Sequence, residues 1–97
     1  MCRMFAGQNP NNYASETRSL RLNGQSTSIR MENAFWSILD KMAEDENVST
    51  PVFISMLHSE VLLLHGEAKN FTSLLRSACL IRLQKKNSNE IATVAAE

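Results

Sequence analysis

Several features that would narrow the function of a 97-residue chain are scarce in this one. Its two cysteines, Cys2 and Cys79, are too few and too far apart for a disulfide framework. Three glycines leave no room for a glycine-rich phosphate loop. The longest apolar run, residues 61–64, is far too short to cross a membrane, and no apolar run of signal-peptide length follows Met-Cys-Arg at the start. We therefore expect a protein of the reducing cytoplasm.

An excess of charge of either sign is also absent, because ten Lys and Arg residues balance ten Asp and Glu residues. Proteins that bind nucleic acids usually carry a basic excess, so this balance argues against that class. The distribution is uneven, however. Residues 1–31 hold four arginines against one glutamate, a local excess of +3, whereas residues 32–97 hold six basic against nine acidic residues, or −3. Three of the four arginines fall within residues 17–31, where the alternation of apolar and polar side chains predicts strands.

The size and apolar content of the chain indicate one folded domain with a modest core. The hydrophobic fraction of 43% is ordinary for a folded protein. A small chain with an apolar second half can complete its core by pairing with another copy, and we therefore consider a homodimer from the start.

A β-hairpin is predicted over residues 17–31. Residues 17–22 alternate apolar and polar side chains, and residues 26–31 do so again. Between them stands Asn23-Gly24, the strongest short hairpin signal, because a type I′ turn needs two residues that tolerate positive φ.

Three helices are predicted to follow. The first, over residues 33–45, has a single apolar stripe with Trp36 at its edge. The second opens at Ser49 or Thr50 and ends at Gly66. The third, from about 70 to 86, is apolar on most of its circumference and should be buried on more than one side. The expected organisation is therefore an N-terminal arm (1–16), a mostly α domain with a short β-hairpin (17–86) and a flexible tail (87–97).

The strand at 26–31 that runs directly into two helices resembles the ribbon-helix-helix family of Arc-, MetJ- and CopG-like DNA-binding domains. The resemblance covers residues 26–64, including the stripe of the first helix and the Asn-Val-Ser turn at 47–49. The chain is more similar still to one bacterial branch of that family. The shared segments are Met-Cys-Arg at 1–3, Thr-Arg-Ser-Leu-Arg-Leu at 17–22, Thr-Ser-Ile-Arg-Met-Glu at 27–32 and Asn-Phe-Thr-Ser at 70–73.

The resemblance implies an intertwined homodimer in which two strands, one from each chain, pair and enter the DNA major groove as a ribbon. Outward side chains read bases, inward ones seal the dimer core, and the start of the second helix clamps a phosphate. The matching positions are Ser26, Ser28 and Arg30 for base reading; Ser49 and Thr50 for phosphate; Ile29, Met31, Phe35 and Trp36 for the dimer core; and Arg18 and Arg21 for attraction to the DNA backbone.

The predicted hairpin complicates this scheme. If it pairs with its dimer mate, the sheet has four strands, and its backbone alone spans roughly 14 Å at about 4.8 Å per strand. The major groove is only about 12 Å wide. Either the 17–22 strand folds over the helices, or the module has lost DNA binding and kept dimerisation.

Other interpretations remain open at this point. An alternating Ser and Arg face is often only solvent-exposed, and Ser49-Thr50-Pro51 is explained as a helix start. His58 and His65 lie two helical turns apart without a completing ligand, so we expect no metal, no cofactor and no enzyme. The leading prediction is a homodimeric DNA-binding transcriptional regulator that acts on double-stranded DNA. The alternative is an antitoxin-like interaction or dimerisation module that binds a protein partner through residues 70–97.

Overall fold

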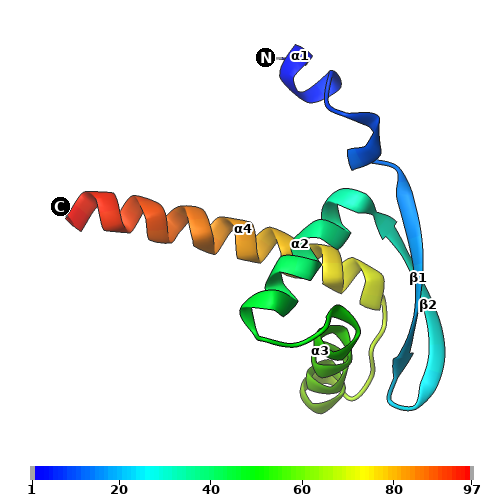
Figure 1. Ribbon diagram of the computed structural model, residues 1–97. Helices are drawn as coiled ribbons and strands as arrows, with labels where there is room; N and C mark the ends of the chain where they lie inside the picture. The colour runs from blue at the N-terminus through cyan, green and yellow to red at the C-terminus, as the bar shows by residue number, and fades with distance from the viewer. Residues whose placement is uncertain (1, 97) are drawn as a thin grey trace.

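The computed structural model describes the backbone of residues 2–96 and the side chains of residues 2–86. A two-stranded antiparallel hairpin forms one side of the molecule, and three helices pack against one of its faces (Figure 1). A short arm precedes the hairpin. Its first helical turn, residues 2–6, stands apart from the three helices (Figure 1), whereas the carbonyl oxygen of Asn11 accepts a hydrogen bond from the Asn33 side chain at 3.0 Å. The elements in chain order are α1 (Cys2–Ala6), a 3-10 turn (Pro10–Asn12), β1 (Ser15–Leu22), β2 (Gln25–Glu32), α2 (Asn33–Asp45), α3 (Thr50–His65) and α4 (Phe71–Ala96).

The predicted hairpin is confirmed, and its strands are slightly longer than predicted. β1 and β2 pair along their whole length, from Leu22 opposite Gln25 to Ser15 opposite Glu32. The turn residues Asn23 and Gly24 have φ values of 53° and 83°. Two positive φ values in a two-residue loop define the type I′ turn, whose twist matches that of the flanking strands. β1 begins inside the segment that was expected to be a loop-like arm, and residues 2–6 of that arm are helical.

The ends of α2 and α3 lie where sequence signals predict them. α2 begins at Asn33 directly after β2, with no loop between them. At the start of α3, the Ser49 hydroxyl accepts a hydrogen bond from the N–H of Val52 at 3.4 Å. α3 ends at Gly66, which has φ 78° and donates its N–H to Leu62.

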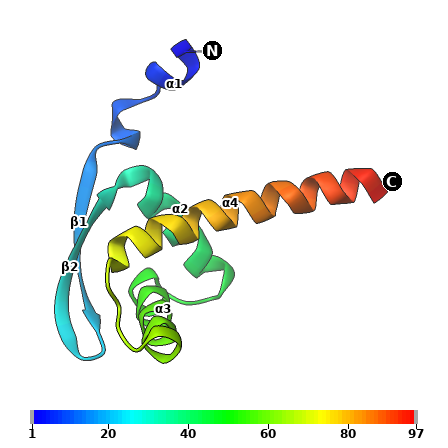
Figure 2. The ribbon, with the colours of Figure 1, turned by 180° about the vertical axis from the view of Figure 1, so that it is seen from behind.

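α4 differs from its prediction in length and in burial. It continues to Ala96, ten residues past Lys86, instead of giving way to a tail without secondary structure. The side chains of residues 87–97 lie outside the described part of the chain. In the described part of α4, Leu75 and Cys79 are buried, while Leu80, Ile81 and Leu83 are exposed. The helix is therefore covered on one side only, and its C-terminal half extends away from the other elements (Figures 1 and 2).

The core lies between the hairpin and the helices. The inward side chains of the two strands pack on α2, α3 and the first half of α4, and together they leave Met31, Leu39, Ile54 and Leu75 without solvent exposure. Among the described residues no single helix is long and apolar enough to span a membrane; α2 and α3 meet that criterion only as a pair, bent by 87°. The buried apolar residues of the core are Leu20, Leu22, Ile29, Met31, Trp36, Leu39, Ala43, Phe53, Ile54, Leu75 and Cys79.

Candidate nucleic-acid interface

The hairpin face turned away from the helices is polar throughout. In an antiparallel pair, directly opposed residues point to the same face and successive residues alternate between faces. Because Leu20, Leu22, Ile29 and Met31 point inward, the residues between them point outward, and all of these except the half-buried Glu32 are exposed. Three opposed pairs make up the middle of this outward face: Thr17 with Arg30, Ser19 with Ser28, and Arg21 with Ser26.

The structure thus brings together the three residues predicted to read bases, Ser26, Ser28 and Arg30, in one row on β2. Beside them runs a second row on β1 that includes Arg21, which was predicted to attract the DNA backbone. Thr17 and Ser19 complete this second row and were not among the predicted site residues. The signal for them was present, because they share the polar positions of an alternating strand with Arg21.

One carboxylate lies at the open end of the outward face. Glu32 sits beside Arg76 of α4, with Arg76 Nε 3.0 Å from a carboxylate oxygen. A hydrogen bond from its own backbone N–H and the bond from Arg76 hold the pKa of Glu32 below its usual range. The negative charge is thus balanced by α4, and the two arginines remain the uncompensated charges of this face.

β1 is fastened to α2 by Trp36 and Arg18. The indole Nε1 of Trp36 donates to the carbonyl oxygen of Glu16 at 2.8 Å. The guanidinium of Arg18 lies 4.4 Å from the centre of the Trp36 rings. It donates to both carboxylate oxygens of Asp40, at 2.8 and 3.2 Å, and also bonds Glu16. Arg18 therefore lies on the helix side of the hairpin, and its charge is neutralised there rather than offered to a DNA backbone.

The turn end of the hairpin is fastened to α3. The side-chain amide of Asn23 lies 3.0 Å from His58 Nδ1, and its carbonyl oxygen accepts from Ser59 at 3.2 Å. His58 in turn meets the ring of Phe71 edge-on, with the centroids 4.9 Å apart. Because both ends are held, the hairpin is presented as a supported ribbon and not as a free loop.

The start of α3 lies on the same side of the hairpin as Arg18. Thr50 donates its hydroxyl to Asp40 Oδ1 at 2.6 Å, and Arg18 binds the same carboxylate. The hydrogen bond from Arg18, followed by the one from Thr50, keeps the pKa of Asp40 low, so this carboxylate is charged. The two residues predicted to bind a phosphate, Ser49 and Thr50, therefore lie at a helix start on the helix side of the hairpin, with the Thr50 hydroxyl bonded to a charged carboxylate.

The family model for the ribbon-helix-helix domain matches residues 15–83 of this chain. The chain belongs to the ribbon-helix-helix family. It is similar to an uncharacterized protein from Bordetella pertussis Tohama I, whose solved structure superposes with a TM-score of 0.85. The two are 39% identical, over 93% of this chain and 71% of that one. None of the curated proteins compared matches the chain.

Three of the four residues assigned to a dimer core are already buried within one chain. The resemblance assigned Ile29, Met31, Phe35 and Trp36 to the centre of a dimer. In the structure Ile29, Met31 and Trp36 are buried by their own chain, and Phe35 is half-buried with the Arg76 guanidinium 5.9 Å from its ring.

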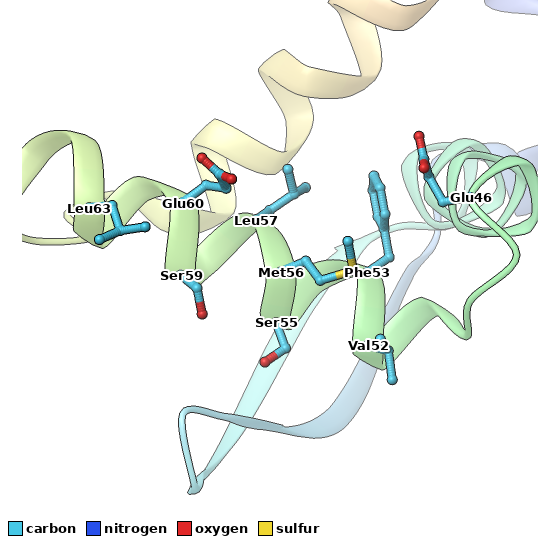
Figure 3. A pocket seen from close by; sticks show the side chains of 9 residues that line it. All are labelled: Glu46, Val52, Phe53, Ser55, Met56, Leu57, Ser59, Glu60 and Leu63. Atoms are coloured by element: carbon cyan, nitrogen blue, oxygen red, sulfur yellow. The ribbon is translucent and has the colours of Figure 1, made fainter.

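The apolar side chains left open in this ribbon-helix-helix domain lie on α3 and α4 instead. A groove of about 580 Å³ runs along the outer side of α3, with Val52, Met56 and Leu63 on its wall and Glu46 and Glu60 among its lining residues (Figure 3). Among the described residues no three His, Cys, Asp or Glu side chains cluster so as to hold a metal ion.

Proposed function

We propose that this protein binds double-stranded DNA in a sequence-specific manner with the outward face of its β1–β2 hairpin, and regulates transcription in a bacterial cytoplasm. The observation that carries the proposal is the hairpin face itself. Its middle consists of four hydroxyl side chains and two arginines, all exposed, on a ribbon fastened to the helices at both ends.

The chemistry of this face suits base edges in the major groove. Arg can donate two parallel hydrogen bonds to O6 and N7 of guanine, and Ser and Thr can donate to or accept from several bases. A two-stranded β-ribbon is one of the two elements that fit the major groove. Among the described residues the face has no uncompensated carboxylate, since Glu32 is paired with Arg76. A chain of zero net charge can therefore still present a locally positive surface to DNA.

We further infer that the protein acts as a homodimer. The support comes from the apolar side chains that the single chain leaves in solvent on α3 and α4, above all Leu63 and Leu64, which are 83% and 73% exposed. A second copy would bury them and would place two hairpins on two half-sites of a palindrome.

The proposal is tested by selecting genomic DNA fragments with the purified full-length protein at low and moderate salt. We expect recovery of a short palindromic sequence, with affinity that falls as salt rises, because phosphate contacts release bound cations. Enrichment of no sequence at either salt would overturn the proposal.

A second candidate function has one observation in its favour. Leu80, Ile81 and Leu83 are exposed on a helix that continues beyond the packed body of the chain. Such a helix suits an interaction module that binds a protein partner through residues 70–97. This candidate would gain support if the DNA selection failed while an α4 surface variant changed assembly.

A further inference from the structure

We propose that the N-terminal arm of one copy, residues 2–14, packs into the α3 groove of a second copy. The α3 groove is the apolar groove along the outer side of α3 described above. Met4 and Phe5 enter it, and Arg3 lies beside its acidic rim. This inference rests on the homodimer proposed above and deepens it, because it names the two segments that meet.

The arm carries apolar side chains that its own chain leaves in solvent. Met4, Phe5 and Tyr13 are 73%, 63% and 58% exposed, and none of the five residues of α1 is buried. An isolated helix shorter than about 12 residues is only marginally stable in water. α1 therefore needs a surface that packs against Met4 and Phe5.

The arm is held at the open end of the hairpin, whereas α3 lies at the turn end. The carbonyl oxygens of Asn11 and Ala14 accept hydrogen bonds from the side chain and the backbone N–H of Asn33, at 3.0 and 2.9 Å. α3 is bonded to the turn through Asn23 and His58. Both ribbon views show α1 projecting away from α3 (Figures 1 and 2). The groove is therefore left uncovered by the arm of its own chain.

The α3 groove has the chemistry and the size to receive the arm. Val52, Met56 and Leu63 are exposed on its wall, and their spacing places them on one face of α3 (Figure 3). A closed cavity of about 150 Å³ is enough to hold a benzene molecule. The groove, at about 580 Å³, therefore has room for the ring of Phe5 together with Met4.

The charges of the two surfaces are complementary. Arg3 is the one charged residue of the arm. The groove is lined by Glu46 and Glu60 and by no lysine or arginine. Both glutamates are exposed, and neither takes part in an ion pair among the described residues. An apolar segment with a single positive charge is therefore the occupant that this groove favours, and the arm is such a segment.

A two-fold pair satisfies both arms and both grooves at once. In an isologous interface, the arm of the second copy meets the groove of the first whenever the reverse contact is made. Because arm and groove belong to opposite ends of the hairpin, the two hairpins run antiparallel, with the open end of each towards the turn end of the other. The assembly closes at two copies, and it contains the contact twice.

The first test measures the dimer dissociation constant of the full-length protein by sedimentation velocity over a concentration series. We expect Arg3→Glu and Glu60→Arg each to raise it by about 5- to 10-fold, because each sets like charges against one another at two contacts. The double variant restores opposite charges and should return to within about twofold of the wild type. Lys41→Glu, the same charge change as Arg3→Glu at an exposed position on α2, is the matched control.

The second test identifies the segments that meet. Cys2 is exposed in the arm and Cys79 is buried, so Ser55→Cys adds one reactive thiol, in the α3 groove. We expect a short bis-maleimide to give a covalent dimer whose peptides join position 2 to position 55. Lys41→Cys adds a thiol away from the groove, and no peptide joining positions 2 and 41 is expected.

The inference requires both the rescue by the double charge reversal and the link between positions 2 and 55. If the wild type dimerises but either result is missing, the arm does not occupy the groove, and the inference is overturned while the homodimer stands. A wild type that stays monomeric at every concentration would overturn the homodimer and the inference together. DNA binding is tested separately, by the selection described above.

Discussion

At the scale of single residues, position in the alternation of a strand decides what each arginine of the hairpin does. Arg18 and Arg21 are three residues apart on β1 and therefore point to opposite faces. Arg18 stacks on Trp36 and binds Asp40, whereas Arg21 is exposed beside Ser26. Composition alone counts them as equal contributions to a basic segment. The face of the hairpin on which each arginine lies decides whether it forms a structural ion pair or is available to a ligand.

The ion pair of Arg18 with Asp40 should make stability depend on pH. The pKa of Asp40 is lowered in the folded state, chiefly by its hydrogen bond from Arg18. A lowered folded-state pKa adds stability above the ordinary Asp value of about 3.9, and that stability is lost as pH falls through the folded-state pKa. We expect Asp40→Asn to lower the free energy of unfolding at pH 7 by about 0.5–1 kcal/mol, a small value because both side chains are partly exposed.

The measurement is the melting temperature of the wild type and Asp40→Asn from pH 7 to pH 2. The difference should be largest near neutrality and should narrow below about pH 4, where the wild-type carboxylate takes up its proton. Lys41→Gln, on the adjacent and exposed position, serves as the control. A difference that stays constant over the whole range would show that Asp40 stabilises the fold without its charge.

The two cysteines should react very differently with an alkylating reagent. Cys79 is buried, its thiol lies 3.7 Å from the carbonyl oxygen of Phe35, and burial raises its pKa to about 11. Cys2 is exposed. Since the thiolate is the reactive form, we expect iodoacetamide at pH 8 to label Cys2 in the folded protein and Cys79 only in denaturant. Peptide mass spectrometry distinguishes the sites, and rapid labelling of Cys79 without denaturant would contradict its burial.

At the scale of elements, predictions from the sequence succeeded where a short signal acts on local conformation. Asn23-Gly24 specifies a turn, and Ser49 and Gly66 mark the two ends of α3. The length of α4 was missed because residues 87–96 lack a regular series of apolar residues at helical spacing, which would have indicated a helix. They also contain no Pro or Gly that would end one. The helix in residues 2–6 was missed for a related reason, since none of its residues is buried.

The hairpin turn offers a direct test at this scale. Gly24 has φ 83°, and no atom lies within 4 Å of where a Cβ would stand. A side chain at position 24 would therefore clash with no other atom, and its cost would be backbone strain alone. We expect Gly24→Ala to lower the free energy of unfolding by about 1–2 kcal/mol, the typical cost of a left-handed conformation for a residue with a Cβ. Chemical denaturation measures it, with the neighbouring Gln25→Ala in extended backbone as the control; equal effects of the two would argue against the type I′ turn.

At the scale of the whole molecule, the sequence could indicate which side chains share a face but not which chain covers them. The alternation correctly separates Ile29 and Met31 from Ser28 and Arg30. The same alternation is satisfied whether a strand of the same chain or of a partner lies beside β2, so it does not distinguish these two arrangements. Likewise, Ser49 and Thr50 match a phosphate site by their position at a helix start. Thr50 also binds the Asp40 carboxylate, which is ten residues away in the sequence, and that contact could not be predicted without the folded structure.

The open apolar surface gives the last prediction, which concerns assembly. The side chain of Leu63 is 83% exposed in the single chain, so replacing it should cost that chain almost nothing. If two copies associate through α3, burying a Leu contributes about 1.5–3 kcal/mol, and two-fold symmetry makes each substitution count twice. We expect Leu63→Gln to raise the dimer dissociation constant by about tenfold or more, while the melting temperature of the dilute protein stays unchanged. Sedimentation velocity over a concentration series measures the first effect, with the exposed Lys69→Gln as control. A wild type that remains monomeric at every concentration, or a Leu63→Gln variant that dimerises as the wild type does, would mean that this side of α3 does not hold two copies together.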